Sequence, residues 1–228
     1  MWKNHRRLIV LGGIAVLLGA GVLFLYGRSR QAGLIEQLRE GDADERVEAV
    51  HGLEKIGSAS AAEAIAGAVN AGDARLAGQA VSALGRMGRP EDLRHIRAAA
   101  KAKDEEVRAA AMTALGSVGD ESDVDVLVEN LCDKQEGARV RAAAALSLGQ
   151  LDRFRAVPSL IESLEDPSPL VRGRAYAAIR KIYQLDVGFR ANDDPAKRQA
   201  AIVRIRQLYP LLKERHADYV RRMKGREE

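Results

Sequence analysis

The sequence predicts an all-α protein: a right-handed α-solenoid of about five helical hairpins with a C-terminal helical cap, preceded by one N-terminal transmembrane helix. Three observations lead to this fold class. A short apolar motif recurs at an interval of 31 to 33 residues, which is typical of stacked supersecondary units. Aromatic residues make up only 4% of the chain, while alanine is abundant. A run without charged residues lies near the N-terminus.

The recurring motif is Ala-Leu-Gly-x-x-Gly, which occurs at residues 83–88 and 114–119 and in degraded form elsewhere. Its apolar anchors are spaced 31, 31, 33 and 31 residues apart: Leu53, Leu84, Leu115, Leu148 and Ile179. The longer interval has a simple source, because the turn at residues 133–137 is two residues longer than its counterparts. The anchors therefore predict five units of one kind between residues 31 and 185.

Each unit contains two apolar stripes at helical spacing. In the fifth unit the first stripe is Val157, Leu160, Ile161 and Leu164, and the second is Val171, Ala175, Ala178, Ile179 and Ile182. Neither short helix can bury its stripe alone, so neighbouring units are expected to stack. Polar residues placed to cap the second helices stand three positions before an apolar residue: Asp73, Asp104 and Ser168. Pro90 and Pro158 are expected in the first turns of first helices.

Residues 1–30 form the predicted N-terminal region, a basic flank followed by a transmembrane anchor at residues 8–26. The run has nineteen uncharged residues, enough to span the hydrocarbon core at about 1.5 Å per residue. A cleaved signal peptide is the alternative, but its apolar core is normally about 7–15 residues. Three basic residues precede the run and two follow it. This bias favours a single-pass protein of the bacterial inner membrane with its N-terminus in the cytoplasm and its solenoid outside.

Residues 186–228 are expected to form a connector and a basic helical cap. Asp194-Pro195 has the pattern of a helix start, and Pro210 is expected to kink or end that helix. The net charge is +4 over residues 186–228 and −5 over residues 31–185. The acidic balance of the repeats argues against nucleic acid as their partner.

The motif resembles that of the HEAT-repeat family, in particular its bacterial branch related to phycobilin lyases. The family pattern Val-Arg-x-x-Ala-x-x-Ala-Leu-Gly-x-x-Gly is matched in full by one run of residues: Val107, Arg108, Ala111, Ala114, Leu115, Gly116 and Gly119. The resemblance covers roughly residues 31–185 and implies HEAT-like hairpins. It says little about activity, because such folds serve many functions.

Four arginines stand seven residues before their anchors: Arg46, Arg108, Arg141 and Arg172. They could form a basic ladder for phosphates or acidic peptides. The resemblance to HEAT repeats instead implies that they bond turn carboxylates and carbonyls between neighbouring repeats. We favour the second interpretation, because phosphate sites usually need a positive surrounding field.

Residues that carry chemistry are not grouped in the sequence. The four histidines lie far from one another and from Cys132, without metal-ligand spacing: His5, His51, His95 and His216. The glycines of the motif follow a helix rather than a strand, so we expect them to end helices and not to bind phosphate. The sequence therefore predicts no catalytic residue, no metal ligand and no cofactor, and the protein is not expected to be an enzyme.

The second helices are expected to line the concave face of the solenoid. The side chains five and two positions before each anchor, and two after it, then point into a groove that suits a partner's peptide or helix. Seven of them are predicted to bind this partner: Arg86, Thr113, Leu146, Gln150, Arg174, Ala177 and Lys181. A merely solvated face is the alternative interpretation.

The predicted function is therefore a membrane-anchored HEAT-repeat scaffold for protein–protein interaction, held to the membrane by its N-terminal helix. One alternative is an accessory or lyase-like factor of a membrane enzyme system. Another is a binder of anionic lipid or nucleic acid that acts through the basic C-terminal segment. The expected partner is a protein, and nucleic acid is not expected.

Overall fold

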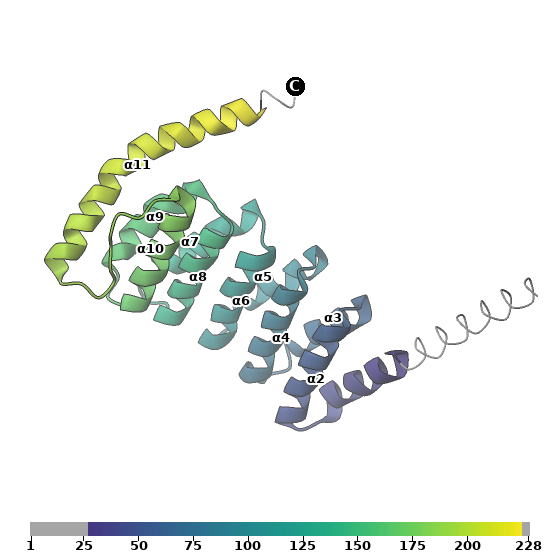
Figure 1. Ribbon diagram of the computed structural model, residues 1–228. Coiled ribbons are helices and arrows are strands. Elements are labelled where there is room, and N and C mark those ends of the chain that lie inside the picture. Colours follow the sequence, from purple (N-terminus) through teal and green to yellow (C-terminus); the bar gives the residue numbers. More distant parts are fainter. Residues whose placement is uncertain (1–26, 225–228) are drawn as a thin grey trace, which may run out of the picture.

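The computed structural model describes residues 27–224, and every regular element in that range is helical (Figure 1). Residues 27–40 are helical and precede the named helices. The α-helices are α2 (Ala43–Ile56), α3 (Ala59–Ala68), α4 (Ala74–Met87), α5 (Leu93–Ala99), α6 (Glu105–Val118), α7 (Val124–Cys132), α8 (Ala138–Gln150), α9 (Val157–Glu162), α10 (Pro169–Tyr183) and α11 (Pro195–Lys224). Short 3-10 helices are η1 (Pro90–Asp92), η2 (Glu121–Asp123), η3 (Phe154–Ala156) and η4 (Ser163–Glu165).

The described helices form five stacked hairpins followed by α11, as the anchors predict. The second helices α2, α4, α6, α8 and α10 pack against one another in sequence and form one face of the solenoid, here called the second-helix face. The helices α3, α5, α7 and α9 lie behind them (Figure 1). The anchors fill the layer between the two rows: Leu53, Leu84, Leu115 and Leu148 are 0% exposed and Ile179 is 1% exposed.

The helix starts follow the sequence closely. Asp73 accepts a hydrogen bond from the backbone N–H of Leu76, and Asp104 caps α6 in the same way. Ser168 stands at the N-cap of α10, but its side chain makes no capping bond. Instead, the carboxylate of Asp166 accepts the N–H of Ser168 at 2.8 Å. The turn before α10 is therefore held by the carboxylate of Asp166, whereas Ser168 was expected to cap the helix.

The glycines of the motif have two different structural roles. Gly88 ends α4 with φ 68°, and Gly57 ends α2 with φ 67°, as predicted. The first glycine of the motif lies inside its helix, so the prediction that it ends the helix was wrong. A Cβ on Gly149 would lie 2.7 Å from the Cα of Ala178, and one on Gly85 would lie 2.9 Å from the Cα of Ala114. These positions must lack a side chain because adjacent second helices touch there.

Replacing Gly149 by alanine is expected to destabilise the protein. The new methyl group meets the backbone of α10, and overpacking of this kind costs about 1–3 kcal/mol, against the roughly 1 kcal/mol that alanine gains over glycine in a helix. Gly67, in α3, is the matched control, since a Cβ there meets nothing within 4 Å. Urea unfolding should show Gly67→Ala slightly stabilised and Gly149→Ala destabilised. Equal stability of the two variants would contradict the close approach of α8 and α10.

The four arginines bond the turns, which confirms the structural interpretation. Arg108 donates to both carboxylate oxygens of Glu136 in the next repeat at 2.8 Å, and to the carbonyls of Ala102 and Lys103 in its own turn. Arg141 does the same with Asp166 and the carbonyl of Glu136. Arg46 and Arg172 bond only carbonyl groups. Three of the guanidinium groups, those of Arg108, Arg141 and Arg172, are thus held by several bonds to turns, whereas Arg46 makes one bond within its own unit.

The connector after α10 is tied to the last repeat. The hydroxyl of Tyr176 accepts the N–H of Val187 at 3.0 Å and of Gly188 at 3.1 Å, and Phe189 is buried. Asp194 then accepts the N–H of Lys197, which starts α11 at Pro195 as predicted. Of the two outcomes expected at Pro210, a kink or a helix end, α11 does not end there: it continues to Lys224 and changes direction along its length (Figure 1).

Among the helices of residues 27–224, none combines the length and the apolar character that a membrane crossing requires. This finding contradicts the predicted localisation, a single-pass protein of the bacterial inner membrane with its solenoid outside the cytoplasm, and we withdraw it. The predicted span itself, residues 8–26, lies outside the described residues.

Candidate partner-binding groove

Three of the seven predicted partner-binding residues line one depression on the second-helix face. Thr113 of α6, Leu146 of α8 and Arg174 of α10 border a hollow of about 310 Å³. Its floor consists of alanines from two neighbouring helices: Ala109, Ala110, Ala142 and Ala143. Glu106, Arg139 and Leu170 complete its wall. We call this depression, with all ten of these residues, the alanine groove.

The repeat chemistry produces the shape of this groove. The glycines of the motif bring successive second helices into contact, so α6, α8 and α10 lie side by side. At the positions that face outward between them, the sequence has alanine, whose side chain is too short to fill the space. Leu146 is half-buried and Leu170 is 47% exposed, so the hollow has an apolar wall that solvent reaches.

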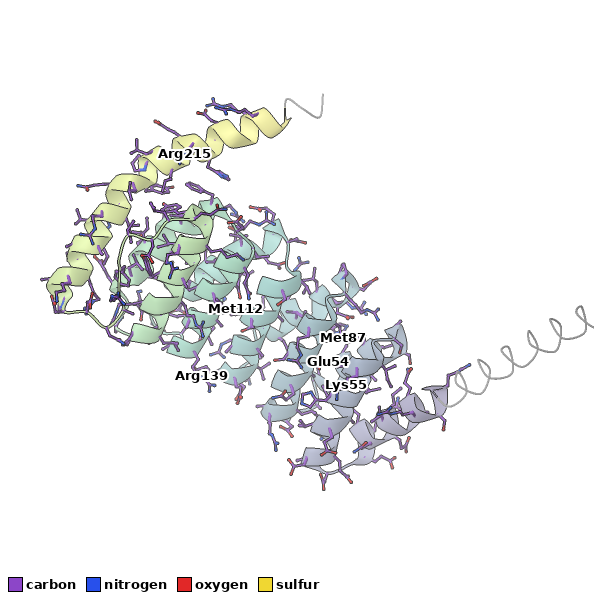
Figure 2. The ribbon with its side chains drawn as sticks, viewed as in Figure 1. Glu54, Lys55, Met87, Met112, Arg139 and Arg215 are labelled. Atoms are coloured by element: carbon purple, nitrogen blue, oxygen red, sulfur yellow. The ribbon has the colours of Figure 1, made fainter. Side chains whose placement is uncertain are left out.

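The groove carries charged groups that have no ion-pair partner. Arg139 and Arg174 are exposed, and neither guanidinium makes a hydrogen bond or ion pair within the described residues 27–224; Figure 2 shows Arg139 near the start of α8. Glu106 faces them from α6. By contrast, Arg75 at the corresponding position of α4 is satisfied by Asp44 at 2.8 Å. Free cations beside exposed apolar surface are therefore concentrated in the C-terminal half of this face.

The remaining four predicted residues lie outside the alanine groove. Ala177 and Lys181 border a second, more open depression of about 560 Å³ near the end of α10. The ammonium group of Lys181 donates to the carbonyl of Gln150 at 3.3 Å. Arg86 donates to both carboxylate oxygens of Glu54 at 2.6 and 2.8 Å, and this pairing lowers the pKa of Glu54. Because Arg86 is engaged within the chain, we do not include it in the proposed site.

The prediction missed three residues of the groove wall, and a simple signal would have found them. They stand nine positions before the anchors, one helical turn before the row that was chosen. Across the five repeats this row reads Asp44, Arg75, Glu106, Arg139 and Leu170. Extending the helical periodicity by four residues would have placed the row on the same face.

The side chains of residues 27–224 include no cluster of three or more histidine, cysteine, aspartate or glutamate residues that could hold a metal ion. Cys132 is exposed on α7 and has no cysteine partner in that range. The groove thus offers apolar surface and charge, which are the means of binding a protein segment.

Comparison with known proteins identifies the class of this chain. HEAT repeats match residues 32–103, 80–149 and 134–223, which together cover most of the chain, and the protein therefore belongs to the HEAT-repeat family. The third match extends past residue 185, the predicted end of the repeats, and includes most of α11. No curated protein sequence matches the chain.

Solved structures share this fold at low sequence identity. The complex of CpcE and CpcF of phycocyanin lyase from Nostoc sp. PCC7120 superposes with a TM-score of 0.58 at 22% identity. That match covers 67% of this chain and 64% of the other, so this chain spans less than two thirds of its neighbour's length. An engineered protein superposes with a TM-score of 0.50 at 20% identity, covering 80% of this chain and 87% of that protein. These likenesses confirm the expected resemblance of fold.

Proposed function

We propose that this protein is an interaction scaffold that binds a segment of a partner protein in the alanine groove, and that it acts by binding rather than by catalysis. The observation that carries this proposal is the combination of an alanine floor, the exposed side chain of Leu170 and two arginines without a partner among the described residues. A solvated face has no need of Leu170 at 47% exposure. Specific interfaces, by contrast, combine an apolar centre with a polar rim.

The charges of the groove define the complementary segment. Arg139 and Arg174 would face carboxylates of the partner, since both are exposed and a guanidinium pairs well with a carboxylate. Glu106, on the α6 side, would face a basic residue. Small apolar side chains of the partner would cover the alanine floor. An amphipathic helix or extended segment with acidic residues along one edge meets these requirements.

The structural comparisons support this function in a general way. The Nostoc neighbour is a complex of two proteins, CpcE and CpcF. This neighbour supports the proposal that the present chain, which has the same fold, also binds another protein. The likeness extends to the fold only. An accessory role in a lyase-like enzyme system is therefore a second candidate, and we assign no residue of the groove to it.

Reversing the two arginines of the groove is expected to abolish partner binding. Arg139→Glu with Arg174→Glu removes both proposed contacts, and both side chains are exposed, so the change in the free energy of unfolding should stay within about 0.5 kcal/mol per site. The matched control is Lys101→Glu with Lys103→Glu, which changes the net charge equally at exposed positions before α6. Affinity capture with quantitative mass spectrometry should show proteins that the wild type and the control retain and the groove variant loses. An unchanged set of captured proteins would refute the groove as the binding site.

A further inference from the structure

The C-terminal helix α11 is anchored by one side of its first half. Ala201, Ile202 and Ile205 are each 1% exposed against the last repeat. Farther along, Phe154 stacks with Tyr209 at a centroid distance of 6.0 Å and with His216 at 4.5 Å. The apolar side of the first half of this helix is thus occupied by its own solenoid. Beyond these contacts the C-terminal part of α11 extends away from the repeats (Figure 1).

The rest of α11 is strongly basic. Between Pro195 and Lys224 the sequence has nine basic residues and only two acidic ones, Glu214 and Asp218. Six of the nine are arginines. Several of these cations are used locally; for example, Arg206 pairs with Glu165 and Arg221 with Asp218. Three exposed cations have no hydrogen bond or ion pair among residues 27–224: Lys213, Arg215 and Arg222. Figure 2 places Arg215 on the part of the helix that leads away from the last repeat.

We propose that the exposed side of α11 binds the phosphate backbone of nucleic acid without sequence preference. This function is separate from the partner-binding role of the alanine groove. Binding to a phosphate backbone needs cations along a surface and no pocket, and arginine suits phosphate because its planar fork donates two parallel hydrogen bonds. A helix of thirty residues is about 45 Å long, which is enough to reach several phosphates of one strand or duplex.

Two other polyanions fit this surface less well. A folded acidic protein would need an apolar contact, and among the side chains of α11 whose exposure the structure describes, the large apolar ones that are exposed are Val203 and Leu211. An anionic membrane would bind an amphipathic helix by inserting its apolar face. In the first half of α11 that face is already buried, since Ile202 and Ile205 pack against the repeats. The acidic solenoid would also be repelled by a negatively charged surface that extends beyond the helix.

The test measures binding of the full chain to a 20-nucleotide single strand and to the corresponding duplex by fluorescence anisotropy between 50 and 200 mM salt. The variant that tests α11, here called the arm variant, is Lys213→Glu with Arg215→Glu. We expect its affinity at 100 mM salt to fall on the order of tenfold or more, and the slope of log affinity against log salt for the duplex to drop by about 1.8, since each lost phosphate contact contributes about 0.9. The control Lys101→Glu with Lys103→Glu, and the groove variant, have the same net charge and should keep wild-type affinity.

Several results would overturn the proposal. Equal loss in all three variants would show that only net charge matters, and wild-type affinity of the arm variant would show that α11 makes no contact. Preference for phosphatidylserine vesicles or for polyglutamate over both nucleic acids would assign the helix to a membrane or to an acidic protein. Circular dichroism of the arm variant confirms that it is folded. The groove variant, Arg139→Glu with Arg174→Glu, separates the two proposals. If it keeps its protein partners, the groove proposal fails, and the proposal that α11 binds nucleic acid still stands.

Discussion

Replacing Arg141 by methionine is expected to lower the free energy of unfolding by about 3–5 kcal/mol, because it leaves a buried carboxylate without its main partner. Arg141 donates to both oxygens of Asp166 at 3.0 Å, and the Asp166 side chain is 0% exposed. In the variant that carboxylate keeps the backbone N–H of Ser168 at 2.8 Å and the exposed Lys134 at 3.5 Å, but loses both hydrogen bonds from the guanidinium. The same arginine also bonds the carbonyl of Glu136, so the substitution loosens two successive turns. Urea denaturation followed by circular dichroism measures the loss.

Two controls identify the cause of this loss. Arg75→Met breaks the exposed pair with Asp44, whose side chains are 62% and 79% exposed, and should cost no more than about 1 kcal/mol. Adding Asp166→Asn to Arg141→Met removes the unpaired charge and should recover part of the stability. If the double variant is as unstable as the sum of the two single variants, the pair does not act as a unit.

The same pair predicts the response to acid. Burial raises the pKa of Asp166, but the hydrogen bonds from Arg141 and from the backbone of Ser168 lower it more, so the folded pKa lies below the ordinary value of 3.8. A depressed carboxyl pKa contributes stability that is fully present above the unfolded value and is lost as the pH falls through the folded one. In Arg141→Met the folded pKa should rise, so the acid transition moves to higher pH.

Replacing Leu115 by alanine is expected to cost about 2–5 kcal/mol, the usual range for truncating a buried leucine. Leu115 is 0% exposed, and its helix, α6, packs against both α4 and α8. Because each repeat is stabilised by its neighbours, the loss should spread to the second and fourth hairpins. Hydrogen exchange should show faster exchange in α4, α6 and α8 together.

Thr113, two residues away on the same helix, provides the control. It is exposed, and its hydroxyl donates only to the carbonyl of Ala109 at 3.0 Å. Thr113→Ala should therefore change stability by no more than about 0.5 kcal/mol. If Leu115→Ala melts at the wild-type temperature, the anchors do not form the core. Faster exchange confined to α6 would contradict the coupling between repeats.

The features that the sequence predicted are those that repeat. The anchors define the five hairpins because each must be buried in the same layer, and Asp73 and Asp104 cap helices through contacts only two or three residues along the chain. The arginine row was assigned to the turns from the family resemblance, and its partners, such as Glu136 and Asp166, lie in the next turn. Periodicity makes such contacts between neighbouring repeats predictable.

The features that were missed depend on how helices lie beside one another. The first motif glycine of α4, α6 and α8 has the sequence context of a helix end. Its role in helix contact follows from the neighbouring helix, as the approach of Ala178 to Gly149 shows. The groove needs three helices side by side, so Arg139 could not be joined to Arg174 by spacing within one repeat. Pro210 was expected either to kink or to end its helix, and its sequence context did not decide between the two; α11 continues past it with a change of direction.

Site-specific photo-crosslinking tests the scaffold function most directly. A photoreactive amino acid replaces Thr113 in the alanine groove or, as control, Glu129 on the exposed side of α7, and crosslinked peptides are identified by mass spectrometry. We predict that position 113 captures a defined segment with acidic and small apolar residues, that position 129 does not, and that Arg139→Glu with Arg174→Glu abolishes the capture. Capture of the same proteins from both positions, or capture that survives the double reversal, would contradict a binding site in the groove.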